Sequence, residues 1–302
     1  MDDATLSATA RKLGSLLEPV TGQVYFSPEC HAEYVALGFD PSPSVRNGVA
    51  LPDGPAYFTS RGSVMGQVTG EVVAAAFAVF NPAVVVPCVE LGWTRTDAST
   101  ISAARDNGAI GQLQRILGDE PVGLARVIEI LNRMVEPLRP EGRPLFAGLR
   151  SLGLPADRIG AMWRLGDMLR EYRGDSHTAS WISAGIDATE IGLMSELYWG
   201  LSPRSYSRTR AWTADDFDAA TERLQQRGIL DDAAELTQDG RRLREDVEVA
   251  TDRQMRATIH AGGDDLDELF TLLAPWGQAI RAAGGYLATG PHDLARAAGG
   301  RG

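Results

Sequence analysis

The chain contains almost no lysine and very little cysteine. Lys12 is the only lysine among 29 basic residues, so the other 28 are arginines. A GC-rich coding sequence accounts for this bias, although arginine also clamps oxyanions bidentately, which lysine does poorly. The two cysteines, Cys30 and Cys88, do not have the spacing of a metal site, and we expect them to be reduced in a cytosolic setting.

Long apolar runs are also missing. No uninterrupted stretch of about 20 apolar residues occurs, so no segment is expected to span a membrane. The first 14 residues are polar and acidic and do not form a basic region followed by an apolar core, which a secretory signal requires. These absences predict a soluble, cytoplasmic protein with no membrane partner.

The motifs of the common cofactor and hydrolase sites are absent. No GxGxxG opens a strand–helix unit, Lys12 does not follow a glycine-rich phosphate loop, and no GxSxG elbow is present. His31, His260 and His292 do not share a metal-ligand spacing. Nucleotide, flavin, zinc-hydrolase and serine-hydrolase sites are therefore disfavoured, and we expect neither a cofactor nor a metal.

What is present predicts an all-α protein. The 302 residues are 44% apolar and 23% charged, which is ordinary globular usage. The segment 72–89 is apolar almost throughout and is expected in the core. Apolar spacing, caps and breakers predict helices over 3–17, 28–37, 55–66, 69–80, 82–91, 97–117, 121–136, 143–151, 157–173, two segments within 176–200, 213–227, 238–259 and 264–283, with a loop over 40–55 and a short hairpin near 229–236.

The predicted elements fall into three parts. Residues 1–201 form a helical domain with the candidate pocket, 202–262 a winged-helix-like module, and 263–302 a C-terminal helix with a flexible tail. The first boundary lies in the polar, basic segment SPRSYSRTRA (202–211), which contains Arg204, Arg208 and Arg210.

Residues 222–248 (ERLQQRGILDDAAELTQDGRRLREDVE) resemble the end of the recognition helix, the wing and the next helix of MarR-type winged-helix regulators. The matching features are Leu224, the RGIL step at 227–230, and Leu236-Thr237 leading to Gly240-Arg241. Winged helices bind DNA, but they also serve as protein-interaction modules.

A wider resemblance covers nearly the whole chain. Five segments are similar to a family of actinobacterial proteins of unassigned function that are often labelled helix-turn-helix. One departure is Arg164, where that family is expected to have a histidine, so a site using that histidine does not carry over. The five segments are RGSVMG (61–66), EVVAAAFAVFNPAVV (71–85), GRPLFAG (142–148), LREYRGDSH (169–177) and TRAWTADDFDAA (209–220).

Charge argues against DNA as the partner of the winged module. The whole chain has a formal net charge of −11. Residues 212–253 contain twelve acidic and six basic residues, and the predicted recognition helix opens with Asp215, Asp216 and Asp218. Such a surface repels a phosphate backbone, which is held mainly by basic clusters.

The segment LREYRGDSH (169–177) is the strongest candidate for a reactive site. We expect it to join two helices, with Gly174 ending the first and Asp175 or Ser176 capping the second. His177 would then act as a general base, oriented by Asp175 or Glu171, while Arg170 and Arg173 hold an anion. The structural alternative is a capped joint with a buried, hydrogen-bonded histidine.

Three further polar residues occur in or beside apolar helices. Arg61, Glu71 and Asn81 must be paired or face a cavity, because isolated buried charge is costly. An Arg61–Glu71 pair could simply fix the helix register. Alternatively, Arg61, Glu71 and Asn81 line the same pocket as His177, with Glu71 as a second acid–base group and Arg61 and Asn81 contacting substrate.

These residues lead to three hypotheses. The first is a cofactor-independent enzyme or catalytic subunit of specialised (natural-product) metabolism, which displaces a sulfate or phosphate from a small polar or anionic metabolite and closes a small ring such as an aziridine. The second is a ligand-responsive winged-helix regulator, with a basic DNA face built from Arg204, Arg208 and Arg210 in a dimer. The third is a non-catalytic interaction module. A homo-oligomer or a small partner protein is compatible with each.

Overall fold

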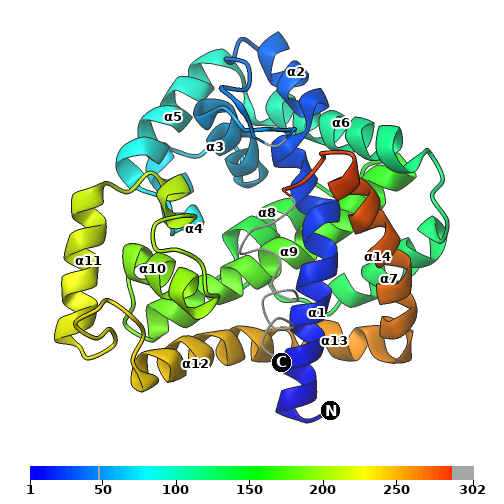
Figure 1. Cartoon of the computed structure of the whole chain (residues 1–302). Coiled ribbons are helices and arrows are strands. Elements are labelled where there is room, and N and C mark those ends of the chain that lie inside the picture. Colours follow the sequence, from blue (N-terminus) through cyan, green and yellow to red (C-terminus); the bar gives the residue numbers. More distant parts are fainter. Residues whose placement is uncertain (47, 288–302) are drawn as a thin grey trace.

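The computed structural model describes residues 1–46 and 48–287, and most of them are helical (Figure 1). The predicted all-α fold is confirmed. A two-stranded antiparallel sheet of β1 (Val45–Arg46) and β2 (Val49–Ala50) lies in the predicted 40–55 loop. The helices are α1 Asp3–Gly22, α2 Pro28–Ala36, α3 Gly54–Gly62, α4 Gly70–Phe77, α5 Pro82–Arg95, α6 Ala98–Leu117, α7 Leu124–Val135, α8 Pro144–Ser151, α9 Arg158–Ser183, α10 Ala188–Tyr198, α11 Ala214–Gln226, α12 Gln238–Gln254, α13 Arg256–Gly262 and α14 Leu266–Ala282.

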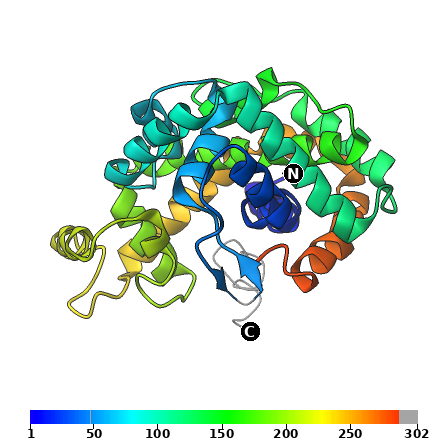
Figure 2. The ribbon, with the colours of Figure 1, turned by 90° about the horizontal axis from the view of Figure 1, so that it is seen from above.

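Helix α9 is the centre of the main core. It packs against α1, α6, α7, α8 and α12, and its Trp163 side chain is fully buried. Figure 2 shows α1 end-on with other helices around it. Because α9 touches helices from both ends of the chain, residues far apart in sequence meet along its sides.

The expected joint at Gly174 is wrong, because α9 is one helix of 26 residues that runs through it. Gly174 is tolerated inside the helix, and neighbours on several sides of α9 hold this segment in place. Asp175 therefore does not cap its own helix. Its carboxylate instead accepts the backbone N–H of Phe146 in the first turn of α8, at 3.1 Å.

Several helices begin within one residue of their predicted starts, and a side chain caps each of them. The side chain of Asn81 accepts the N–H of Ala83 at the start of α5, and Asp97 accepts that of Thr100 at the start of α6. Thr213 and Asp216 cap α11 reciprocally. Side chains that satisfy the free N–H groups of a first turn fix where a helix begins.

A second core lies beside the main one. It joins the end of α9 to α10, α11 and α12, and includes Trp181, Met194 and Leu224. The apolar segment 72–89 was expected in the core, but part of it lies at the surface, where Val72 is 47% exposed. The division into domains stays a prediction, and the second core also draws on α10, N-terminal to residue 202.

The end of the described chain is anchored. Tyr286, which lies in the segment predicted as a flexible tail, is buried, stacks edge-on against Phe26, and donates its hydroxyl to Glu18 at 2.7 Å. The remainder of that predicted tail, residues 288–302, lies outside the described residues. Among the helices of the described part, none combines the length and apolar character needed to cross a bilayer.

The contact between α2 and α6 predicts a sharp difference between two glycines. A Cβ at Gly108 would lie 2.4 Å from Cα of Cys30, whereas a Cβ at Gly111 would meet only the Glu29 side chain, at 3.4 Å. We therefore expect Gly108→Ala to lower the free energy of unfolding by about 1–3 kcal/mol, because α2 must move away.

Gly111→Ala is the matched control, and should be neutral or stabilising by up to about 1 kcal/mol because alanine is the better helix former. Urea unfolding followed by circular dichroism measures both. Equal stability of the two variants would contradict the packing described for α2 and α6.

Candidate functional site

Helices α10, α11 and α12 lie together, and we call them, with the hairpin between α11 and α12, the winged unit after the predicted winged-helix-like module (Figure 1). After α11, a short hairpin is closed by a bridge between Leu230 and Leu236, and α12 follows. Residues 199–213 connect α10 to α11, a longer connection than the turn of about three or four residues in a simple helix-turn-helix.

The connection between α10 and α11 is held by one buried carboxylate. Glu196 accepts the backbone N–H groups of Arg204, Tyr206 and Ser207 at 2.6–2.7 Å, and the hydroxyl of Ser207 at 3.0 Å. Glu196 has no exposed surface. The segment predicted as a linker is therefore fixed to α10.

Helix α11 turns an apolar face inward and an acidic face outward. Phe217 and Ala220 pack on Leu193 of α10, and Leu224 belongs to the second core. On the outer side, Asp215, Asp218, Ala219, Glu222, Arg223 and Gln226 are exposed. Three of these six side chains are acidic and one is basic, so the outer face of α11 is net negative.

The predicted basic face is not assembled in the single chain. Arg204 pairs with Asp218, and Arg210 lies over the ring of Phe80, 4.5 Å from its centroid. Arg208 is exposed and has no ion-pair partner among the described residues. Only one of the three linker arginines is thus free to meet a phosphate.

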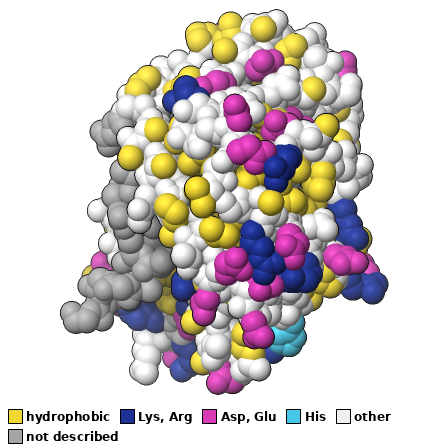
Figure 3. Space-filling view, turned by 90° about the vertical axis from the view of Figure 1, so that its right-hand side faces the viewer, with side chains coloured by type: hydrophobic (Ala, Val, Ile, Leu, Met, Phe, Trp, Pro, Cys, Tyr) yellow, Lys and Arg dark blue, Asp and Glu magenta, His cyan; other side chains and the backbone are white. Residues whose placement is uncertain are grey.

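Basic and acidic side chains are also interspersed elsewhere. On the face shown in Figure 3, Lys and Arg side chains lie beside Asp and Glu side chains and form no broad positive patch. Arg126, for example, pairs with Glu129, Asp265 and Glu268.

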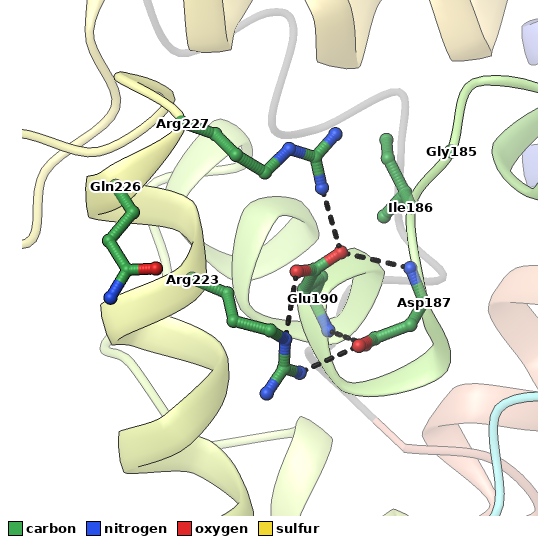
Figure 4. Close-up of a pocket in the computed structure, with 7 residues that line it drawn as sticks. All are labelled: Gly185, Ile186, Asp187, Glu190, Arg223, Gln226 and Arg227. Atoms are coloured by element: carbon green, nitrogen blue, oxygen red, sulfur yellow. Dashed lines mark hydrogen bonds and ion pairs between the residues drawn. The ribbon is translucent and has the colours of Figure 1, made fainter.

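A hollow of about 390 Å³ lies between the start of α10 and the end of α11 (Figure 4). At its centre the nearly buried carboxylate of Glu190 accepts Arg223 Nε at 3.2 Å and Arg227 Nη1 at 3.1 Å. Arg223 also donates to Asp187, the cap of α10, at 2.6 Å. This cluster ties α11 to α10.

A separate buried charge cluster joins α9 to α1 and α3. Arg61 donates to both oxygens of Glu171, at 3.1 and 2.8 Å, and Arg170 donates to Glu171 and Glu18, at 2.8 and 2.9 Å. Burial alone would raise the pKa of Glu171, but the two guanidinium groups outweigh it and hold that pKa below its usual value.

This cluster corrects the predicted Arg61–Glu71 pair. Glu71 is exposed in the first turn of α4, where the positive end of the helix favours an acid. The partner of Arg61 is Glu171, 110 residues away in sequence. Arg61 and Arg170 were predicted to hold a substrate anion, but both form ion pairs with carboxylates of the chain itself. Asn81 caps α5 and donates to the carbonyl of Ala211 at 3.1 Å.

His177 faces α12. Its Nδ1 lies 3.2 Å from the hydroxyl of Thr251, which itself donates to the carbonyl of Val247, so Nδ1 carries the hydrogen. Burial lowers the pKa of His177 to about 4. Arg173 faces the same helix and donates to Glu248 and Asp252, at 2.9 and 3.2 Å.

The predicted His177–Asp175 pair is not formed. The two residues are two apart on a continuous helix, so their side chains leave it in different directions. The predicted site residues are therefore distributed over an α9–α3–α1 cluster, an α9–α12 cluster, the contact of α9 with the start of α8, the start of α5, and the surface of α4.

Sequence reasoning missed the carboxylates that organise these clusters, namely Glu18, Glu171 as the partner of Arg61, Glu190 and Glu196. For Glu190 a signal was present. Asp187 and Glu190 have the spacing of a capping box, and both reciprocal hydrogen bonds are formed.

The model of the helix-turn-helix family matches residues 10–287, and the chain belongs to this family. No curated protein and no solved structure matches the chain. The family membership overturns the ring-closing enzyme hypothesis, because this family indicates a regulator that binds DNA.

Asp175 predicts a specific pH dependence of stability. Burial, with a contribution from Glu171, raises the pKa of this carboxyl from 3.8 to about 7, so the native state binds more protons than the unfolded state between these values. Stability contributed by Asp175 is then largest at low pH and is lost as the pH rises through 7.

Asp175→Asn keeps an acceptor for the Phe146 N–H but cannot ionise. Relative to this variant, the native chain should lose a few kcal/mol of unfolding free energy between about pH 5 and pH 8. Urea unfolding at both pH values measures the difference. A difference that does not change with pH would show that Asp175 titrates normally.

Proposed function

We propose that the chain is a ligand-responsive transcriptional regulator that binds DNA through its winged unit. The family match, which covers residues 10–287, carries this proposal. The MarR-type likeness of residues 222–248, and the likeness of five segments to actinobacterial proteins, agree with it. A cytoplasmic location and action as a homo-oligomer belong to the proposal, since dimeric regulators read two half-sites.

Within the winged unit, α11 is the element that can enter a groove. It is packed on α10 along one side only, and its other side is exposed. Arg208 lies just before α11 and Arg241 in the first turn of α12, and both are exposed without an ion-pair partner among the described residues. These two arginines are the candidates for phosphate contacts.

The acidic outer face of α11 would then select against DNA that offers no favourable base contacts. Asp215, Asp218 and Glu222 repel phosphates, so binding to arbitrary DNA should be weak. Carboxylates can still accept the N4 amino group of cytosine in the major groove. Binding would therefore depend on base contacts more than in most regulators.

The same acidic face favours a second candidate, in which the winged unit contacts a protein instead of DNA. Winged helices are used in both ways. The two candidates differ in whether any duplex sequence is selected by the chain.

The experiment is selection from a random duplex library with the full chain, followed by affinity measurements on the selected duplex. We expect an enriched sequence, and a shallow salt dependence with a slope of about −2 for each bound protomer, because two arginines of each protomer contact phosphates. Arg208→Gln and Arg241→Gln should each reduce that slope by about one per protomer.

Glu222→Gln should strengthen binding to unselected DNA severalfold at low salt, because one repelling charge is removed. Glu33→Gln, on the exposed surface of α2, is the matched control and should have no effect. If no sequence is enriched, or if both arginine variants bind like the native chain, the DNA-binding proposal is wrong and the protein-contact candidate is favoured.

A further inference from the structure

We infer that the hollow between α10 and α11 binds a small molecule that carries an oxyanion, either a carboxylate or a phosphate. This inference rests on the proposed function, because it supplies the effector site of a ligand-responsive regulator. It is argued from the hydrogen-bond donors and acceptors that line the hollow.

Every carboxylate oxygen at the hollow is already engaged. Asp187 Oδ1 accepts the N–H groups of Thr189 and Glu190 at 2.9 and 2.8 Å, and its Oδ2 accepts Arg223. Glu190 Oε1 accepts Arg223, while Oε2 accepts Arg227 and the N–H of Asp187 at 3.0 Å. Two lone pairs are left for a cation or a donor, one on Asp187 Oδ2 and one on Glu190 Oε1.

Donors, in contrast, are left over. Arg223 Nη1, Arg227 Nε and Arg227 Nη2 have no hydrogen-bond partner among the described residues. The two side chains are 44% and 38% exposed, so these nitrogens can be reached from solvent. Gln226 adds an exposed amide to the lining. A surplus of planar guanidinium donors matches carboxylate or phosphate oxygens.

The size and walls of the hollow indicate the rest of the ligand. The hollow of about 390 Å³ is open to solvent, so a small molecule in it stays partly exposed. Gly185 and Ile186 line the side of the hollow opposite Arg227, although the Ile186 side chain is largely buried in the second core (Figure 4). Because two carboxylates balance the two arginines, the oxyanion is held by directed hydrogen bonds and not by net charge, and we expect an affinity of about 0.1–1 mM.

A ligand in the hollow can affect α11 directly, because two of the arginines that line the hollow belong to the end of α11. Arg223 and Arg227 join α11 to Glu190 of α10. An oxyanion that draws Arg227 toward itself changes how α11 is held, and by linkage a ligand that prefers one arrangement of α11 alters DNA affinity.

The test is titration of the full chain, without DNA, with benzoate and separately with inorganic phosphate, followed by amide NMR and calorimetry. We expect saturable shifts at residues 185–190 and 223–227. Tighter binding of benzoate assigns the natural ligand as an apolar carboxylate, and tighter binding of phosphate assigns a phosphorylated one.

Arg227→Gln should weaken binding at least tenfold, and Gln226→Glu, which keeps both arginines but adds a negative charge, should weaken it too. Arg242→Gln, an exposed arginine of α12 that does not line the hollow, is the matched control. Absence of saturable shifts with either probe at about 10 mM, or equal losses in Arg227→Gln and Arg242→Gln, would overturn the inference.

Because no DNA is present, the titration tests only the small-molecule site. It can fail while duplex selection succeeds, and it can succeed while duplex selection fails. A second arm adds the selected duplex to the benzoate-loaded chain. Linkage lowers or raises the apparent affinity for benzoate to a plateau as duplex is added. If that affinity instead falls without limit, the duplex occupies the hollow itself, the donors belong to the DNA contact, and the small-molecule site is wrong.

Discussion

Pairing between arginine and carboxylate within the chain is the interaction on which both parts of the structure depend. Glu171 lies between Arg61 and Arg170 in the main core, and Glu190 lies between Arg223 and Arg227 in the winged unit. Removing one partner of a buried pair costs roughly 3–5 kcal/mol, because it leaves an uncompensated charge. These clusters join α1 and α3 to α9, and α11 to α10, and the arginines in them are paired with the chain's own carboxylates.

That use of charge shapes the proposed function. An acidic chain in which many arginines pair with its own carboxylates has weak general attraction for nucleic acid, so a regulator built on it relies on specific contacts. Two acids of α10 hold the segment that follows it. Glu196 binds the connection between α10 and α11, and Glu190 binds Arg227 at the end of α11. Changes at either acid should therefore reach α11.

Much of the fold could be predicted from local signals, and little of the site could. Asn81, Asp97 and Thr213 marked helix starts because capping is a contact over two or three residues. The continuity of α9 through Gly174 was missed because tertiary packing overrides the local tendency of glycine to end a helix. The partner of Arg61 was misassigned because Glu171 is brought near it only by the folding of α3 against α9. Glu71 and Asp175 were predicted beside Arg61 and His177, but Glu71 is exposed at the start of α4 and Asp175 binds the backbone of α8.

The most direct measurement is amide hydrogen exchange of the full chain with and without the duplex that it selects. The account predicts slower exchange confined to residues 204–226, the hairpin near 230–236 and the first turn of α12. Protection on α6, α7 or α14 instead, with none on α11, would contradict the assignment of the winged unit as the DNA-contacting part of this helix-turn-helix protein.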